Sequence, residues 1–269
     1  MKKWMYNVLI GIFAAVFLVS ATFLVIYFTD GAQQDERYDE LSSMKEEVTP
    51  RPTIGEDGEQ PEQPSLVEVT NPKTGEKISI LPDFVDLYKQ NPDIVGWITI
   101  PDTKVDYPVM QTTDDPDYYL YRNFDKKDSK RGCIYTWPTN DVFAPSDNIT
   151  IYGHHMRDGS MFAALMKYKK KAFYEEHRYI YFDTLTELHT YEIIAVLRTT
   201  ATEGKGFSYH AFVDANTEKE FDKFISTCKK LDLYDTGVTA QFGDKLICLS
   251  TCEYSQENGR LVVVAKRIV

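Results

Sequence analysis

Positive charge is scarce in this chain of 269 residues. It has 30 lysine and arginine residues against 41 aspartate and glutamate residues, which gives a formal net charge of −11. Proteins that bind nucleic acids usually present a basic surface, so we expect no nucleic-acid partner. The chain also has no long internal repeat, which argues against a solenoid or another repeat architecture.

Histidine and cysteine are scarce as well, with five and four residues. Cys248 and Cys252 are near each other in the sequence, and His154 and His155 are adjacent. These four residues supply zinc-ligand types, but their spacing matches no standard zinc motif. We therefore expect no metal and no cofactor, with zinc as the weaker alternative.

Disulfides are restricted by the same spacing. Cys248 and Cys252 are four residues apart on an expected strand, which separates them by about 13 Å and excludes a direct bridge. A bridge between Cys133 and Cys228 stays open. Buried thiols are the favoured interpretation for this second pair.

One long apolar run lies near the start. Residues 9–28, LIGIFAAVFLVSATFLVIYF, contain no charge, and about 20 such residues are needed to cross the apolar core of a bilayer. We expect a membrane-spanning helix rather than a cleaved signal peptide, whose apolar region is only about 7 to 15 residues long. Lys2 and Lys3 precede the run, and acidic residues follow it. By the positive-inside rule, residues 1–8 form a short cytoplasmic N-terminus, and everything after the run is extracellular.

A strongly acidic segment follows the apolar run. Between residues 30 and 66 there are eleven acidic and three basic residues, together with Pro50, Pro52, Pro61 and Pro64. Such a segment buries too little apolar surface to offset the entropy lost on ordering it. We therefore predict an extended extracellular tether over residues 29–69, in which a short helix can form around residues 38–47.

The remaining residues, 70–269, are expected to fold as one domain. Apolar residues at helical spacing predict helices at 82–88, at 161–168 with an extension toward 176, and at 218–231. Short strands broken by Pro, Gly and Asp favour a closed barrel or a sandwich over alternating strand–helix units. The eight predicted strands are residues 94–100, 107–111, 133–137, 148–155, 179–183, 191–200, 245–252 and 261–268.

The residues around Cys252 form the first candidate site. A β-type run ends in Cys252, a polar loop follows, and Arg260 opens the next run, LVVVA at 261–265. A strand-turn-strand fold would bring the thiol and the guanidinium group side by side. By itself, a cysteine at a strand end is more often a small buried residue than a nucleophile.

Two histidines end another expected strand, where residues 149–156 read ITIYGHHM. An imidazole beside a cysteine can stabilise the reactive thiolate and carry protons, so Cys252 with His154 or His155 is a candidate nucleophilic pair. Neighbouring residues on a strand point to opposite faces, so only one of the two histidines can face Cys252. The residues alone leave that choice open.

Three motifs together resemble those of the sortase family. The run LSTC at 249–252 resembles the cysteine motif of the family, with Cys248 in place of the threonine that usually opens it. The run YGH at 152–154 resembles the histidine motif, and Arg260 resembles the family's arginine. The motifs occur in the family's order, and the likeness extends from about residue 84 to residue 268. The double histidine, the helix after it, the insertion between residues 200 and 243 and the N-terminal anchor are most similar to class B sortases.

The resemblance implies a mainly β fold, a closed eight-stranded sortase-type β-barrel with added helices, preceded by one transmembrane helix. It implies a cysteine transpeptidase on the outer face of a Gram-positive cell membrane. Cys252 would be the nucleophile, His154 the general acid/base, and Arg260 the residue that holds the substrate or the developing oxyanion. The role of His155 is left open. The thiolate would attack the carbonyl after the threonine of a sorting motif, and an amine would resolve the thioester.

Four further residues are expected to line the peptide groove. Ser250 is two residues before Cys252 on the same strand face, and Glu253 follows the nucleophile, where nearby backbone N–H groups are expected to complete an oxyanion site. Leu120 and Thr202 correspond loosely to groove positions of class B members. For these last two, a place in the core or in a loop is an equal alternative.

The implied partners are surface proteins that carry a sorting signal, and an amine acceptor. The acceptor would be either a lipid-linked peptidoglycan precursor or a lysine of a pilin subunit. Two other interpretations stay open. One is a cysteine hydrolase that releases the same acyl intermediate to water, and the other is a non-catalytic surface-binding domain on the same barrel.

Overall fold

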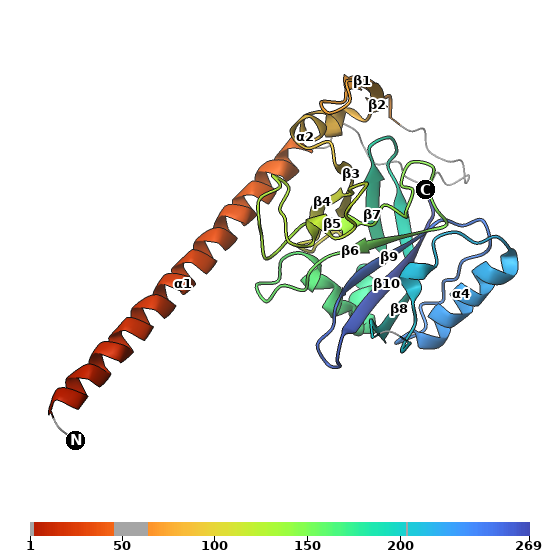
Figure 1. The fold of residues 1–269 in the computed structure, drawn as a ribbon. Coiled ribbons are helices and arrows are strands. Elements are labelled where there is room, and N and C mark those ends of the chain that lie inside the picture. Colours follow the sequence, from red (N-terminus) through yellow and green to blue (C-terminus); the bar gives the residue numbers. More distant parts are fainter. Residues whose placement is uncertain (1–2, 46–63, 203) are drawn as a thin grey trace. The chain divides into compact units, whose positions relative to one another are not determined.

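The computed structural model describes residues 3–45, 64–202 and 204–269. The chain divides into two compact units, of which the first ends at Ser43 and the second is Met44–Val269. In the first unit a single helix, α1 (Lys3–Met44), contains the apolar run (Figure 1). Its segment Lys3–Val25 has a mean hydropathy of 2.7 and is long and apolar enough to cross a membrane, criteria that an N-terminal signal sequence also meets.

Helix α1 continues past residue 28 into the segment that we predicted as an extended tether, and it includes residues 38–44 of the short helix predicted around 38–47. Arg37 and Glu40 form an ion pair of 2.7 Å across one turn of this part of the helix, and such pairs stabilise helices. The first proline of the acidic segment is Pro50, so no proline interrupts the helix before Met44. Residues 46–63 of the predicted tether lie outside the described residues.

The second unit contains a closed barrel with the strand order β10-β8-β7-β3-β4-β5-β6-β9 (Figure 1). Its strands coincide with the eight predicted ones, and the closure decides between the two predicted architectures. β4 and β5 pair in parallel, as do β6 and β9, whereas the other neighbours are antiparallel. The strands are β3 (Ile94–Thr99), β4 (Asp106–Met110), β5 (Ile134–Thr136), β6 (Asn148–Tyr152), β7 (Tyr179–Thr184), β8 (Thr190–Thr200), β9 (Leu246–Cys252) and β10 (Gly259–Arg267).

The remaining elements precede the barrel or connect its strands. The helix predicted at 161–176 is a 3₁₀ segment followed by a short α-helix, and the one predicted at 82–88 begins with a 3₁₀ turn. The helix predicted at 218–231 has the predicted bounds. These elements are the hairpin β1 (Val67–Thr70) and β2 (Lys77–Ile80), then η1 (Pro82–Phe84), α2 (Val85–Gln90), η2 (Tyr118–Leu120), η3 (Phe162–Lys169), α3 (Lys171–Glu176), η4 (Tyr209–Ala211) and α4 (Glu218–Leu231).

Helix α4 covers the outer face of the barrel. Thr217 caps it by accepting a hydrogen bond from the Glu220 N–H, which satisfies one of the otherwise unpaired donors of the first turn. Its apolar face packs against β8, β9 and β10, and the buried cluster includes Cys228 from the helix and Cys248 from β9. Burial raises the pKa of the Cys228 thiol to about 12 and that of Cys248 well above its usual value. Cys133, Cys228 and Cys248 are all buried free thiols, so the Cys133–Cys228 bridge left open above is not formed.

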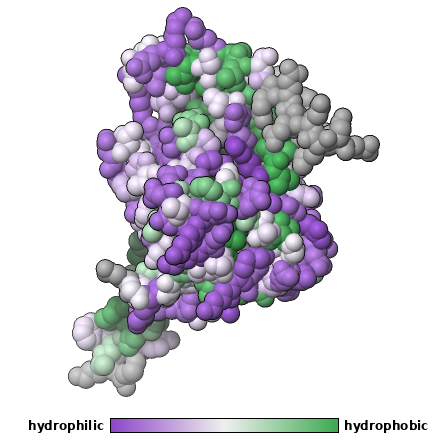
Figure 2. Space-filling view, turned by 90° about the vertical axis from the view of Figure 1, so that its right-hand side faces the viewer, coloured by the Kyte–Doolittle hydropathy of each residue, from purple (hydrophilic) through white to green (hydrophobic). Residues whose placement is uncertain are grey.

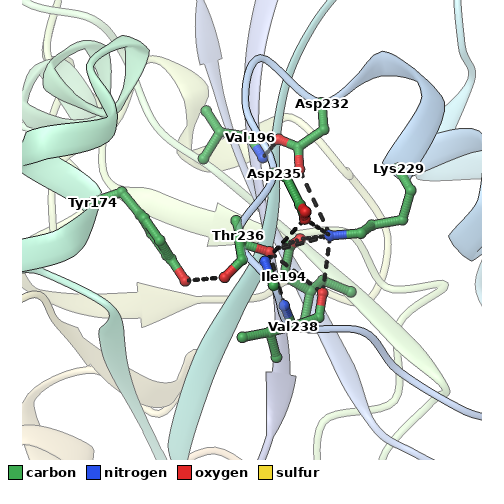
Figure 3. Close-up of polar contacts among 9 residues, drawn as sticks. Tyr174, Ile194, Val196, Lys229, Asp232, Asp235, Thr236 and Val238 are labelled. Carbon is green, nitrogen blue, oxygen red and sulfur yellow. Dashed lines mark hydrogen bonds and ion pairs between the residues drawn. The ribbon is translucent and has the colours of Figure 1, made fainter.

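A lysine fastens the end of α4 to a bulge in β8. The pairing of β8 with β10 shifts by one residue, so Ile194 has no partner in the ladder. Its carbonyl accepts hydrogen bonds from Lys229 Nζ at 2.9 Å and from the Thr236 hydroxyl at 2.7 Å (Figure 3). Asp232 accepts from the Val196 N–H at 2.9 Å. The carbonyl that the bulge frees is therefore satisfied by Lys229 in the last turn of α4 and by Thr236 after the helix.

The face of the molecule seen in Figure 2 is mostly hydrophilic, with apolar residues in small separate groups. The apolar residues of β9 and β10 are instead buried on both sides of the sheet. Leu246 and Cys248 pack toward α4, and the alternate residues Ile247 and Leu249 face the barrel interior. Because both faces of β9 are buried, its sequence has a continuous apolar run rather than an alternating one.

A buried histidine, His189, lies in the turn between β7 and β8, and no nearby charge in the described parts of the chain offsets the cost of burying its protonated form. His189 is 5% exposed, and its Nδ1 has no hydrogen-bond partner among the described residues. Burial, reinforced by the charge of Arg267, outweighs the attraction of Asp183 and lowers the pKa of His189 to about 4. Glu187 lies 3.3 Å from Nε2, but its carboxylate is half exposed and screened by water, so it does not offset the burial of the ring.

This burial predicts a loss of stability on acidification. The unfolded chain takes up a proton at His189 near pH 6.5, whereas the folded chain does so only near pH 4. The free energy of unfolding should therefore fall as the pH decreases from 6.5 to 4, by up to about 3 kcal/mol from this residue. Urea unfolding of the wild type and of His189→Gln at pH 7.5, 5.5 and 4.5 measures this contribution, and the variant should show the shallower dependence. Parallel curves for the two proteins would contradict it.

Candidate functional site

The pairing of β9 with β10 places Cys252 and Arg260 together. The two residues are directly opposite each other in the antiparallel register, so their Cα atoms are about 4.5 to 5.5 Å apart and their side chains share one face. Ser250 and Cys248 lie on that same face, which α4 covers further along the strand. Cys252 and Arg260 lie beyond the helix and are both partly exposed.

The parallel pairing of β6 with β9 brings the histidines to the same end of the barrel. Its last registered pair is Tyr152 with Ser250, so His154 and Cys252 each lie two residues beyond that pair. Gly153 lies between, and a Cβ atom there would be 2.5 Å from Ile134 Cδ1. Only glycine therefore lets the chain pass this close to the barrel wall on its way to the histidines.

His154 is held by a backbone carbonyl rather than by a carboxylate. Its Nε2 lies 2.8 Å from the Leu120 carbonyl oxygen, and since a carbonyl only accepts, Nε2 carries the proton and donates. Nδ1 is then the nitrogen left for chemistry. Leu120 ends the 3₁₀ turn η2 in the β4–β5 connection, and the Tyr121 ring lies 5.7 Å from the His154 ring.

His155 makes a different contact. Its Nδ1 donates to the carbonyl oxygen of Cys252 at 3.1 Å, and its ring is stacked on Tyr254 with 5.2 Å between centroids. The two histidines thus use different ring nitrogens and different partners. This is the expected result for neighbours on an extended chain, whose side chains point to opposite faces.

Glu253 follows the nucleophile candidate but is turned inward. It is only 3% exposed, and its carboxylate accepts hydrogen bonds from Lys169 at the end of η3 and from Ser255. Burial opposes ionisation, but these donors outweigh it and lower the pKa of Glu253. Its N–H donates to the Gly259 carbonyl at 2.9 Å, so the N–H group that we expected near an oxyanion already has a partner.

Ser250 and Thr202 both have hydrogen-bond partners near the candidate site. The Ser250 hydroxyl lies 2.6 Å from the Tyr209 hydroxyl and is buried, and burial raises the pKa of Tyr209 to about 12. Thr202 accepts a hydrogen bond from Thr200 at 3.0 Å and one from Asn258 Nδ2 at 3.4 Å. Thr202 therefore lies against the β9–β10 turn, next to Arg260.

Arg260 itself is oriented by the backbone of that turn. Its Nη1 donates to the carbonyl oxygens of Gly259 at 3.0 Å and Asn258 at 3.4 Å. A guanidinium has five N–H donors, so these two bonds leave Nη2 and Nε for a ligand. Arg260 also lowers the pKa of His210, after burial the second cause of that shift, which places the His210 ring near the guanidinium.

An aromatic group beside the site was missed at the sequence level. Tyr152 stacks with Trp137 at 5.2 Å and lies 5.4 Å from Tyr135. Asp117 Oδ1 accepts hydrogen bonds from the Tyr135 hydroxyl at 3.0 Å and from Trp137 Nε1 at 3.2 Å. Cys252 and Arg260 both influence the pKa of Tyr135, which burial raises, so these rings border the candidate site. The only sequence signal is the spacing of aromatic residues on β5 and β6.

Cys248 takes no part in a metal set with the histidines. It is fully buried against α4, and both histidines bind backbone carbonyls. Within residues 3–45, 64–202 and 204–269, no group of three or more His, Cys, Asp and Glu side chains lies together as metal ligands would. The chemistry available at this end of the barrel is that of a partly exposed thiol, an imidazole and a guanidinium.

The fold and this residue set can be compared with known proteins. The model of the sortase domain matches residues 98–268. Sortase B of Listeria monocytogenes is 36% identical over 185 residues, which cover 68% of this chain and 73% of that protein. Sortase B of Staphylococcus aureus is 32% identical over 191 residues, or 70% of this chain and 76% of that protein.

Solved structures agree with this result. A Staphylococcus aureus sortase B–substrate complex superposes with a TM-score of 0.71 at 27% identity, covering 89% of this chain and 98% of that one. A sortase B structure from B. anthracis gives a TM-score of 0.68 at 32% identity, with 89% and 98% coverage. The chain therefore belongs to the sortase family of cysteine transpeptidases and, by these similarities, to its class B.

Proposed function

We propose that this enzyme cleaves a sorting motif after threonine and transfers the acyl part to an amine of a cell-wall precursor, with Cys252 as nucleophile. The observation that carries the proposal is the meeting of three strand ends. Cys252 ends β9, and Arg260 is opposite it on β10. His154 lies two residues beyond the last registered pair of β6 and β9, which supports its assignment as the partner of Cys252. A nucleophile, a proton carrier and a cation are the groups that acyl transfer requires.

In the first half-reaction the Cys252 thiolate attacks the carbonyl carbon after threonine. The tetrahedral intermediate collapses as the C–N bond breaks, and the leaving amine takes a proton from His154 Nδ1. The hydrogen bond from His154 Nε2 to the Leu120 carbonyl supports this role, because it fixes the ring and leaves Nδ1 for the proton. The product is a thioester on Cys252.

Arg260 stabilises the negative charge that develops on the substrate oxygen. The N–H of Glu253 is bonded to Gly259, so the guanidinium is the donor that remains beside Cys252. Its Nη1 is anchored to two carbonyl oxygens of the β9–β10 turn. A donor that is oriented before the reaction stabilises charge without reorganisation in the transition state.

In the second half-reaction an amine attacks the thioester. His154, now neutral at Nδ1, accepts the proton of the incoming amine, and the Cys252 thiolate leaves. The proposed acceptor is an amine of a lipid-linked peptidoglycan precursor, with a lysine of a pilin subunit as the alternative. Surface proteins that carry a sorting signal are the proposed donors.

The proposed groove residues act in two ways. Leu120 and Thr202 border the site from the two connections that flank it, and we assign them contact with the sorting peptide. Ser250 and Glu253 are buried and hydrogen-bonded to Tyr209 and Lys169. We assign these two the task of holding the groove floor and the turn after Cys252.

We further propose that α1 anchors the enzyme in the cell membrane, with the barrel on the extracellular side. The length and hydropathy of Lys3–Val25 support this topology, as do Lys2 and Lys3 at its start and the acidic residues after it. An anchored sortase would stay close to acceptors that are themselves bound to lipid.

The nucleophile assignment predicts the effect of Cys252→Ala. The full-length chain in detergent, mixed with a library of threonine-containing sorting peptides, should form an adduct of the acyl mass at Cys252 and release the C-terminal fragment. In Cys252→Ala, the rates of adduct formation and of fragment release should both fall about a thousandfold or more, because no other thiol faces the site. Mass spectrometry of protein and peptides measures both products.

Cys248→Ala is the matched control, because that thiol is buried under α4 and should be dispensable for cleavage. Adding an amine such as triglycine separates the possible outcomes. A ligated product supports transpeptidation, whereas release to water alone would support the hydrolase. Full cleavage by Cys252→Ala would refute the proposed mechanism. If the wild type forms no acyl adduct with any peptide, the interpretation as a non-catalytic binding domain would be favoured instead.

The role of Arg260 predicts that lysine cannot replace it. Arg260→Lys keeps the charge but loses the planar donor set that is anchored to the β9–β10 turn. We expect the rate of acylation to fall about a hundredfold, as for loss of an oxyanion donor, with little change in thermal midpoint. Arg267→Lys, at the other end of β10, is the control and should retain activity. Equal rates for the two variants would contradict the assignment.

A further inference from the structure

The second histidine, His155, has no part in the reaction proposed above, yet it contacts the nucleophile's own backbone. Its Nδ1 donates to the Cys252 carbonyl oxygen at 3.1 Å. We propose that His155 is a positioning residue that holds the Cys252 peptide group and so aims the thiol at His154. This inference rests on the proposed function for its kinetic consequences and on the structure alone for its mechanical ones.

The pairing of β9 with β10 explains why the Cys252 carbonyl needs a donor. In an antiparallel ladder, hydrogen-bonded pairs alternate with pairs that exchange no hydrogen bond. Glu253 donates to Gly259 at 2.9 Å, so the neighbouring pair, Cys252 with Arg260, is of the second kind. The backbone groups of Cys252 therefore turn away from β10, toward β6.

Strand β6 ends too early to supply that donor. Its last registered residue, Tyr152, pairs with Ser250, two residues before the nucleophile. Beyond that pair the two segments are joined by the Gly153 N–H to the Ser250 carbonyl at 3.1 Å and by the Thr251 hydroxyl to the Gly153 carbonyl at 2.8 Å. The His155 imidazole makes the next link, and it is the one that reaches Cys252.

The ring of His155 is itself held in place. It is stacked on Tyr254 with an angle of 24° between the rings, and the Tyr254 hydroxyl donates to the His155 carbonyl at 3.4 Å. Tyr254 is 72% exposed, so it covers the imidazole from the solvent side. We call His155, Tyr254 and the Cys252 carbonyl the His155 clasp.

The two adjacent histidines bind different carbonyl groups. His154 donates through Nε2 to Leu120, whereas His155 donates through Nδ1 to Cys252. A histidine that binds a carbonyl through one N–H keeps that bond in its neutral and charged forms. His155 therefore serves as a fixed donor and needs no change of protonation during the reaction.

Two substitutions distinguish the contribution of the His155 hydrogen bond from that of its ring stacking. His155→Phe keeps a flat ring to stack on Tyr254 but has no N–H. His155→Asn loses the ring but places an amide N–H close to the position of Nδ1. His177→Phe is the matched control, because His177 also has its Nδ1 against a backbone carbonyl, that of Phe173 at 2.9 Å, and stacks on an aromatic ring, but follows α3.

The kinetic experiment uses the full-length enzyme and the sorting peptide that the wild type acylates fastest. We expect His155→Phe to lower kcat about tenfold to a hundredfold with KM unchanged, since a small misplacement of a reacting atom has effects of this size. His155→Asn should recover kcat to within a few-fold of the wild type. The pH values at the midpoints of the rate profile should be the same for all three proteins.

A second experiment needs no substrate. Hydrogen exchange followed by mass spectrometry should show about fivefold faster exchange over residues 250–258 in His155→Phe. His155→Asn should exchange at nearly the wild-type rate, and His177→Phe should leave this segment unchanged.

Three results would overturn the proposal. They are unchanged exchange in His155→Phe, equal kinetic defects in His155→Phe and His155→Asn, and a displaced pH profile in His155→Phe, which would give His155 a role in proton transfer. If the wild type acylates no peptide, the proposed function fails, and the exchange experiment still decides whether the clasp exists.

Discussion

The register of two ladders, β6 with β9 and β9 with β10, is the constraint on which the rest of this structure depends. Side chains alternate along a strand, so a shift of one residue in either ladder would turn Cys252 toward the barrel interior or separate it from its neighbours. The β6–β9 pairing joins segments that are almost a hundred residues apart in the sequence. Closure of the barrel, rather than any local motif, therefore brings the segment with the two histidines to the end of β9, where His155 contacts Cys252.

The site lies where the ladders stop, and that position creates a need for side-chain partners. Backbone groups at strand ends have lost their ladder partners and must be satisfied in another way. Here the Leu120 and Cys252 carbonyls are bonded to histidines, and the β9–β10 turn presents two carbonyl oxygens to Arg260. The same hydrogen bonds that satisfy the strand ends thus orient the proposed catalytic groups. In the His154 ring, the Leu120 carbonyl fills the orienting role that a carboxylate can fill beside a histidine.

Sequence reasoning reached the strands and the family but not the connections between distant side chains. All eight barrel strands were predicted, because β-type runs bounded by turn residues are a local signal. The burial of Glu253 was not predicted, because its partner Lys169 comes from η3 and no residue near position 253 indicates this contact. Asp117 and Tyr209 were missed for the same reason, as each meets the site only through the fold. The helix past residue 28 was underestimated because acidic composition was weighed above the absence of proline before Pro50.

The adjacent histidines show how one strand end can serve two tasks. An extended chain sends consecutive side chains to opposite faces, so a pair of identical residues meets two different environments. His154 binds the Leu120 carbonyl, and we propose that its other nitrogen serves the thiol. His155 binds the backbone carbonyl of Cys252. Proton transfer needs a ring nitrogen that is left open, whereas positioning needs one that is permanently bonded. The choice of nitrogen, Nε2 bonded in one ring and Nδ1 in the other, follows from where each carbonyl lies. The two imidazole side chains are therefore proposed to have different roles because the backbone directs them to different partners.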